Sequence, residues 1–434
     1  MVFFKNYLQC FGGIALAALV ISDSQMLEAA WTTPVVISDS ISDQPNIAVD
    51  LSGNAVAVWQ GFDGNNYVIQ SSKLPYSGNW SQITTLSSAG QDAQGCRVAI
   101  DSSGNAVSSW SRFDGNYSII QSASLPYNSS WSQSVNVSLS GANAEAPELA
   151  MDYIGSVGNA VLVWHRYNGS NFIVQGSQLE SGGSWSTPDN LSASGQDAFI
   201  PEVAVDSNGN AITIFSRYNT SEFTSCTVSL LHGQNWSSSS TLSNPSQPAN
   251  GPQVALDPSG NAVAVWSEFN GTNYVIKTSN LPYGSSWSTV QSLSDSSQNA
   301  FAPSVSLDGD GNAVVAWLRF DGSNYIVQAA VASFGGSWST PVNLSSSGED
   351  ANNVMVKMNS AGQALVVWDQ TSATDSCVYS ASYSIGGTWG STESVSSRGN
   401  FARFPSVGLD SSGNAVAVWL QFDGTKDVVY GSSL

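Results

Sequence analysis

The sequence predicts an all-β protein, an eight-bladed β-propeller made of four-stranded antiparallel blades. Three observations lead to this fold class. One motif recurs eight times at a period of about 50 residues, each copy contains four short strand patterns, and the two ends of the chain are incomplete in complementary ways. Short alternating strands at such a period are typical of a ring of four-stranded sheets.

Tryptophan marks each copy of the motif, which reads Gly-Asn-Ala-Val-Ala-Val-Trp or a close variant. The phrase ends in an aromatic residue at Trp59, Trp110, Trp164, Phe215, Trp266, Trp317, Trp368 and Trp419. A second tryptophan follows the first seven of these at a spacing of 21 residues, at Trp80, Trp131, Trp185, Trp236, Trp287, Trp338 and Trp389. Because large aromatic side chains fill the wedges between blades, we expect all of them to be structural.

Each copy contains four strand patterns joined by short turns. The first strand is Pro-x-Val-Ala-x-Asp, as in Pro201 to Asp206, and the second is the Ala-Val-Ala-Val-Trp run. The third, such as Asn66 to Gln70, follows a Phe-Asp-Gly or Phe-Asn-Gly turn, and the fourth begins at a Trp-Ser pair. Asp-Gly and Asn-Gly between apolar runs are strong hairpin signals, so consecutive strands should pair antiparallel.

The chain ends complete each other. The eighth copy stops at Leu434 without a fourth strand, whereas Trp31 begins a fourth strand that precedes the first complete copy. A ring closed by pairing the segment Trp31 to Ser38 beside Asp427 to Tyr430 removes the exposed sheet edges. A solenoid is the alternative fold, but an open solenoid does not require the N-terminal strand to complete the last repeat.

Residues 1–30 differ from the repeats. Lys5 is the only charged residue among the first 22, an apolar stretch covers residues 11–21, and the segment ends in Ala29-Ala30. This pattern predicts a secretory signal peptide cleaved after Ala30. Residues 31–434 would then form one propeller domain that is secreted, periplasmic or at the cell surface.

The net charge excludes some classes of partner, and the cysteine positions bear on disulfide formation. The net charge of −20, with only 12 basic residues, argues against nucleic acid and anionic membranes, which require basic surface. No segment after the signal is apolar enough to insert into a membrane. Cys96, Cys226 and Cys377 fall in distant blades, and Cys10 lies in the signal, so no disulfide framework is expected. We expect a monomer.

Function is best sought where equivalent positions disagree. The residue after the proline position of the first strand is Asn46, Arg97, Glu148, Glu202, Gln253, Ser304, Met355 or Ser406 around the ring. Two residues later, seven copies have Ala, Ser or Gly, whereas the seventh copy has Lys357. Alternation places both positions on the same side of the innermost strand, near the channel. Arg97, Glu148, Glu202, Gln253 and Lys357 are therefore the candidate ligand-binding site; the alternative is a set of solvated channel charges.

A second irregular set lies two residues after the aromatic residue of the second strand. It consists of Arg112, Arg166, Arg217 and Arg319. These side chains should reach the rim loops that carry Asp92, Asp197 and Asp350, so we expect arginine–carboxylate contacts that hold the rim together.

The sequence gives little support for metal binding or catalysis. Asp308 and Asp310 resemble part of a calcium loop, but the second acid is present in this copy alone, so the recurring Asp is expected to cap its own turn. No metal or cofactor is expected. His165 and His232 assemble no recognisable catalytic set. Glu148 and Glu202 are the one pair that would suit glycoside hydrolysis.

The repeat resembles one found in exported bacterial proteins of uncharacterised function. The resemblance rests on Trp-Ser-x-Pro-Val-x-Leu-Ser, Gly-Gln-Asp-Ala, Pro-x-Val-Ala-x-Asp and Gly-Asn-Ala-Val-Ala-Val-Trp, and it covers residues 31–434. The hairpin between the first two strands is also similar to NHL repeats and, more distantly, to the Asp-box of sialidases, although the six-residue step from Gly53 to Trp59 departs from the Asp-box spacing. The resemblance implies fold and export, and no activity.

These observations favour an exported propeller that binds rather than catalyses. Its ligand would be a glycan or an envelope or host protein. A carbohydrate-active hydrolase or lyase that uses Glu148 and Glu202 is the first alternative, and a purely structural envelope protein is the second.

Overall fold

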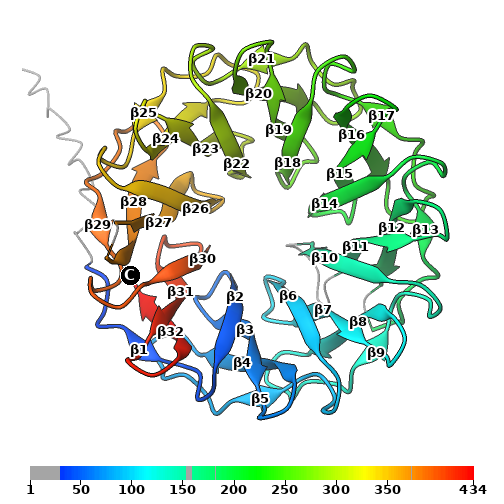
Figure 1. Cartoon of the computed structure of the whole chain (residues 1–434), viewed down its shortest axis with the longest axis vertical. Coiled ribbons are helices and arrows are strands. Elements are labelled where there is room, and N and C mark those ends of the chain that lie inside the picture. Colours follow the sequence, from blue (N-terminus) through cyan, green and yellow to red (C-terminus); the bar gives the residue numbers. More distant parts are fainter. Residues whose placement is uncertain (1–29, 153–158, 181, 373) are drawn as a thin grey trace, which may run out of the picture. The chain divides into compact units, whose positions relative to one another are not determined.

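The computed structural model describes residues 30–152, 159–180, 182–372 and 374–434. Residues Trp31–Leu434 form one unit of eight four-stranded antiparallel sheets, arranged as blades in a ring (Figure 1). This confirms the eight-bladed propeller. Within the described ranges no helix is long and apolar enough to cross a membrane. The predicted signal peptide lies outside the described residues except for Ala30, and it stays a prediction.

Every blade has the same order of strands from the centre outward. The first, innermost strands are β2 (Ser42–Val49), β6 (Ala93–Ile100), β10 (Ala144–Met151), β14 (Ala198–Val205), β18 (Ala249–Leu256), β22 (Ala300–Leu307), β26 (Asp350–Met358) and β30 (Arg403–Leu409). The second strands are β3 (Ala55–Phe62), β7 (Ala106–Phe113), β11 (Ala160–Tyr167), β15 (Ala211–Tyr218), β19 (Ala262–Phe269), β23 (Ala313–Phe320), β27 (Gln363–Thr371) and β31 (Ala415–Phe422).

The two outer layers differ in length. The third strands are β4 (Tyr67–Leu74), β8 (Ser118–Leu125), β12 (Phe172–Leu179), β16 (Phe223–Leu230), β20 (Tyr274–Leu281), β24 (Tyr325–Ala332), β28 (Ser376–Ser384) and β32 (Asp427–Ser433). The fourth strands have two residues each: β5 (Thr84–Thr85), β9 (Val135–Asn136), β13 (Asp189–Asn190), β17 (Ser240–Thr241), β21 (Gln291–Ser292), β25 (Val342–Asn343), β29 (Glu393–Ser394) and β1 (Val35–Val36).

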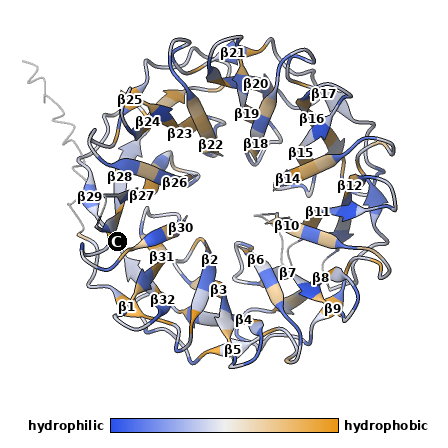
Figure 2. Ribbon diagram, viewed as in Figure 1, coloured by the Kyte–Doolittle hydropathy of each residue, from blue (hydrophilic) through white to orange (hydrophobic). Residues whose placement is uncertain are grey.

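The second strands form the core of the ring. Both of their faces are covered by neighbouring blades, so they are runs of Ala, Val and Ile rather than alternating patterns. All eight aromatic residues that end the motif are 0% exposed, which confirms their structural role. The innermost strands instead carry both hydrophobic and hydrophilic segments (Figure 2).

In the third and eighth blades, the outer tryptophan is hydrogen-bonded to the preceding blade. Trp185 Nε1 donates a hydrogen bond of 2.6 Å to Ser122 Oγ, on the third strand of the preceding blade. Trp31 Nε1 donates in the same way to Ser380 Oγ at 2.9 Å, so Trp31 occupies the corresponding place in the eighth blade.

The N-terminal strand closes the ring as predicted. β1 pairs antiparallel with β32 through Val35 opposite Gly431 and Val36 opposite Tyr430. Backbone hydrogen bonds continue beyond this ladder, from Thr32 N to Ser433 O and from Ile37 N to Val429 O. The regular strand is shorter than the predicted Trp31 to Ser38, because the chain leaves the ladder after two residues in every blade.

The innermost strands begin earlier than the sequence predicts. β14 starts at Ala198, three residues before Pro201, and its pairing with β15 shifts at a β-bulge between Phe199 and Glu202. Every blade has this bulge, and the residue before the proline position has φ between 48° and 66° at Gln44, Gly95, Ala146, Ile200, Gly251, Ala302, Asn353 and Phe404. Positive φ is costly for residues other than glycine, which is why the pattern before Pro resembled a loop.

Deleting residues 31–38 should open the ring at β32. We expect the free energy of unfolding to fall by about 2–5 kcal/mol, the cost of removing one buried isoleucine side chain, since Ile37 is 6% exposed. Self-association should rise because the edge of β32 becomes free. Chemical denaturation and light scattering measure the two effects.

A permuted chain provides the matched control for this deletion. Moving residues 31–38 to follow Leu434 through a short turn should restore stability, since Thr32 N already lies 2.8 Å from Ser433 O. Equal stability of the deleted and intact chains would contradict the role of β1.

Candidate functional site

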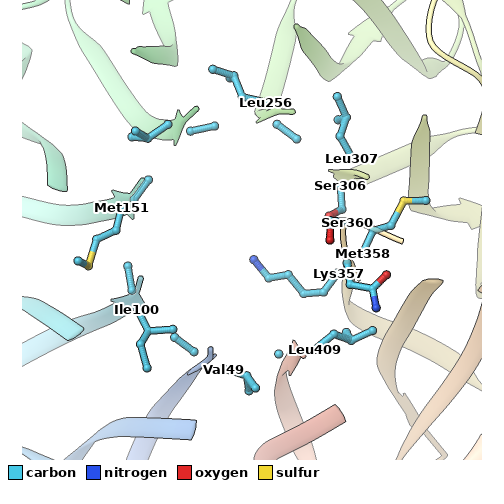
Figure 3. Close-up of a pocket in the computed structure, with 18 of the residues that line it drawn as sticks. Val49, Ile100, Met151, Leu256, Ser306, Leu307, Lys357, Met358, Ser360 and Leu409 are labelled. Carbon is cyan, nitrogen blue, oxygen red and sulfur yellow. The ribbon is translucent and has the colours of Figure 1, made fainter. Parts of the chain in front are cut away.

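The innermost strands enclose a channel with two chambers. The mouth, on the side of the bulges, is a cavity of about 980 Å³. The chamber at the other end measures about 370 Å³ and is lined mostly by apolar side chains (Figure 3). Arg97, Glu148, Glu202, Gln253 and Lys357 all line the mouth, so the structure brings the five predicted site residues together.

Arg97 and Glu148 form a bidentate ion pair between the second and third blades. Arg97 Nε donates to both carboxylate oxygens of Glu148 at 2.9 and 2.8 Å, and Nη2 donates to Oε1 at 2.6 Å. Arg97 Nη1 also donates to Cys96 O at 3.0 Å. The side chains are 35% and 19% exposed, so the pair is fixed in position and still open to a ligand.

Glu202 lies in the fourth blade and accepts a hydrogen bond of 2.8 Å from Gln253 Nε2 in the fifth. Burial raises the pKa of Glu202 to about 8, and the negative charge of Glu148 acts in the same direction. Arg97, Gln253 and Lys357 oppose this rise. The carboxyl group therefore changes its charge near neutral pH, unlike an ordinary surface glutamate.

Lys357 lies deeper than the other four residues and lines both chambers. In Figure 3 its side chain extends into the lumen, where the other blades present alanine, serine or glycine. The channel walls lower the pKa of Lys357 by desolvation, while Glu202 and Glu148 partly offset this effect. Lys357 thus places one ammonium group between the polar mouth and the apolar chamber.

The equivalent residues of other blades have structural roles. Three of these side chains accept a hydrogen bond from a backbone N–H of the next blade. Asn46 Oδ1 accepts from Val98 N at 3.0 Å. Ser304 Oγ accepts from Val356 N at 3.1 Å, and Ser406 Oγ accepts from Ile47 N at 3.3 Å. These contacts join neighbouring innermost strands. The charged and amide side chains of the second to fifth blades therefore occupy one arc of the mouth.

The rim arginines do not make the expected carboxylate contacts. Arg112 Nη2 and Arg166 Nη2 donate to the carbonyl oxygens of Ser88 and Ser140, each at 3.4 Å. Asp92 instead accepts the backbone N–H of Tyr67 at 2.9 Å, which leaves it satisfied by the main chain. The ion pairs found in the described ranges are Arg97–Glu148, Arg398–Glu349 and Arg403–Asp427.

The acidic turn at Asp308 has the predicted capping geometry. Asp308 Oδ1 accepts the backbone N–H groups of Asp310 and Asn312 at 2.9 and 2.8 Å, and Oδ2 accepts Asn312 Nδ2 at 2.7 Å. Asp308 therefore satisfies the turn itself. No group of three or more His, Cys, Asp or Glu side chains placed to hold a metal occurs in the described part of the chain.

His165 is a mouth residue that the sequence reasoning missed. It lines the mouth beside Glu145 and Glu148, and its ring contacts Phe172 and Phe199 at centroid distances of 5.5 Å. Burial lowers the pKa of His165 to about 4, so the ring is neutral at physiological pH. The sequence could have indicated this residue, because His165 is an aromatic ring at a position where the other blades have Ser, Gln, Asp or Leu.

The fold and the channel define a class, a β-propeller with a polar central site, and comparisons with known proteins agree on the fold. No family model and no curated protein matches the chain. Among solved structures, a polysaccharide lyase, an ulvan lyase bound to -[GlcA(1-4)Rha3S]-, matches 92% of this chain and 95% of its own, with 10% identity and a TM-score of 0.50.

Two further structures match at lower scores. The leech intramolecular trans-sialidase is 8% identical, with 93% and 94% of the chains covered and a TM-score of 0.43. An α-L-arabinofuranosidase of Fusarium graminearum is 14% identical, with 70% and 98% covered and a TM-score of 0.42. At 10% identity the match to the lyase shows a shared fold alone, and the resemblance to exported bacterial repeat proteins stays a prediction.

Titration of Glu202 provides a direct test of the site's electrostatics. Its pKa in the folded protein, about 8, lies above the ordinary value of 4.5, so native Glu202 holds its proton more tightly than the unfolded chain does. Wild-type stability should therefore fall relative to Glu202→Gln as the pH rises from about 4.5 to about 8. Denaturation across this window and carboxyl NMR measure the effect.

Lys357→Met is the matched control. Removing the ammonium group should raise the pKa of Glu202 further, because Lys357 favours the charged carboxylate. A midpoint for Glu202 near 4.5 in both proteins would contradict the electrostatics described.

Proposed function

We propose that this protein is an exported β-propeller that binds a glycan at the channel mouth. The observation that carries the proposal is the arc of Arg97, Glu148, Glu202 and Gln253, completed below by Lys357, in an open cavity of about 980 Å³. Other blades fold with short or uncharged residues at these positions. The arc is therefore not required by the fold, which supports selection for a ligand.

The chemistry of the arc suits a polyhydroxylated ligand. Sugar hydroxyl groups both donate and accept hydrogen bonds, and the arc offers carboxylate acceptors beside guanidinium and amide donors. The Arg97–Glu148 and Glu202–Gln253 contacts hold these groups in place before a ligand arrives, which reduces the entropy lost on binding.

A hydrolase or lyase is the second candidate, favoured by the different environments of the two glutamates. Glu202 has a raised pKa and suits a general acid, whereas both oxygens of Glu148 are held by Arg97. Such an asymmetric pair is the pattern of acid catalysis beside a fixed carboxylate. The engagement of Glu148 by Arg97 makes binding the better supported function.

A glycan array probed with the purified protein tests the proposal. The protein should bind a subset of glycans saturably, and a variant with Arg97, Glu148, Glu202 and Lys357 changed to alanine should bind roughly thirtyfold or more weakly, because it loses the charged partners of the ligand. A charge-matched control changes Lys73, Glu180, Lys277 and Glu393 on the outer strands and turns, and it should bind as wild type.

The outcomes separate the candidates. Turnover of a bound glycan that Glu202→Gln abolishes would make the protein an enzyme. Absence of binding by the wild type, or equal binding by the site variant, would overturn the glycan proposal and direct the search to an envelope or host protein.

A further inference from the structure

Aromatic side chains form a continuous cluster on the rim of the third and fourth blades. The cluster, here called the aromatic arc, consists of His165, Tyr167, Phe172, Phe199, Tyr218 and Phe223. Phe199 joins the two blades, with ring centroids 5.0 Å from Phe172 and 6.2 Å from Phe223. Tyr167 and Tyr218 end the arc at 5.3 Å from Phe172 and Phe223 and are 38% and 37% exposed.

The fold does not require this arc. At the position of Phe199, the other blades carry Asp43, Gln94, Glu145, Asn250, Phe301, Asn352 and Arg403. At the position of Phe223, the second and seventh blades have serine and the eighth has Asp427, whereas the remaining blades have tyrosine or phenylalanine. Polar residues therefore occupy both positions in some blades of the same geometry, so a blade can fold without an aromatic ring at either position.

The arc is continuous with the mouth. His165 belongs to both, since it lines the mouth cavity beside Glu148 and contacts the rings of Phe172 and Phe199 at 5.5 Å. Its imidazole Nδ1 is buried without a hydrogen-bond partner in the described structure. Phe199 also lies three residues before Glu202 on β14, across the bulge. One strand therefore connects the polar arc of the mouth with the aromatic arc of the rim.

We propose that the aromatic arc is an extended subsite that binds successive sugar rings of a glycan chain entering the channel mouth. This inference rests on the proposed function, which it extends by specifying that the glycan is a chain of several sugar residues. The C–H faces of a pyranose carry partial positive charge and stack on the negative faces of aromatic rings. Phe172, Phe199 and Phe223 are half-buried rings that lie in series between the exposed Tyr167 and Tyr218, while the mouth supplies the polar contacts.

The aromatic arc therefore predicts that the affinity for a glycan rises with the number of its sugar residues. A monosaccharide can occupy the mouth alone, whereas a longer oligosaccharide gains stacking on the rim. A second aromatic group, at Phe269, Tyr274, Phe301, Phe320 and Tyr325, offers a built-in comparison. Phe301 is the structural equivalent of Phe199, but its ring contacts are with Tyr274 and Tyr325 rather than with a mouth residue.

The test measures binding of the full chain to an array of defined neutral and uronate-containing oligosaccharides of one to six residues. Phe199→Asn and Phe223→Ser introduce the residues that other blades carry at these positions, so both variants should fold. Each should lose roughly tenfold in affinity for the longer ligands. Affinity for the monosaccharide should stay unchanged, and Phe301→Asn should bind every length as wild type.

The outcomes distinguish this inference from the proposed function. If Phe199→Asn and Phe223→Ser bind every length as wild type while the mouth variant fails, the arc has no role and the mouth proposal stands. Equal losses in Phe199→Asn and Phe301→Asn would also overturn the arc, because the effect would not follow its contact with the mouth. Absence of binding by the wild type would overturn both.

Discussion

The structure depends on the burial of both faces of every second strand between neighbouring blades. This requirement places a fully buried aromatic residue in the middle of each of these strands, from Trp59 to Trp419. A sheet buried on both faces cannot stand alone, so each blade is stable only beside two others. The ring must therefore close, and β1 supplies the last pairing with β32.

Ring closure fixes the residue type at some positions of each blade and leaves the residue type free at others. The second strands and outer tryptophans hold the blades together, whereas the first strands need only a small residue or a short polar link at the channel. Asn46, Ser304 and Ser406 make such links to the next blade. Arg97, Glu148 and Glu202 occupy the same position and instead pair with side chains or face the lumen.

The bulge before each proline position determines how the mouth is shaped. The residue with positive φ shifts the pairing of the first strand with the second strand. Residues before the bulge and residues after it therefore occupy different places relative to the channel. In the fourth blade, Glu202 lies in the mouth and Phe199 on the rim. A polar cavity and an aromatic surface thus arise from one short segment, and desolvation in the cavity gives Glu202 its raised pKa.

The eight blades, the order of the strands and the closure by Trp31 to Ser38 could be predicted from the sequence, because they follow from repeated local patterns and from the fourth strand that the last copy lacks and the N-terminal segment supplies. The sequence also placed Arg97, Glu148, Glu202, Gln253 and Lys357 in the channel, since alternation fixes the side of a strand. The three-dimensional structure was needed to show which of them pair, where the bulges lie and which rings contact His165. Those contacts join neighbouring blades about 50 residues apart in the chain, and no local pattern specifies side-chain geometry across that separation.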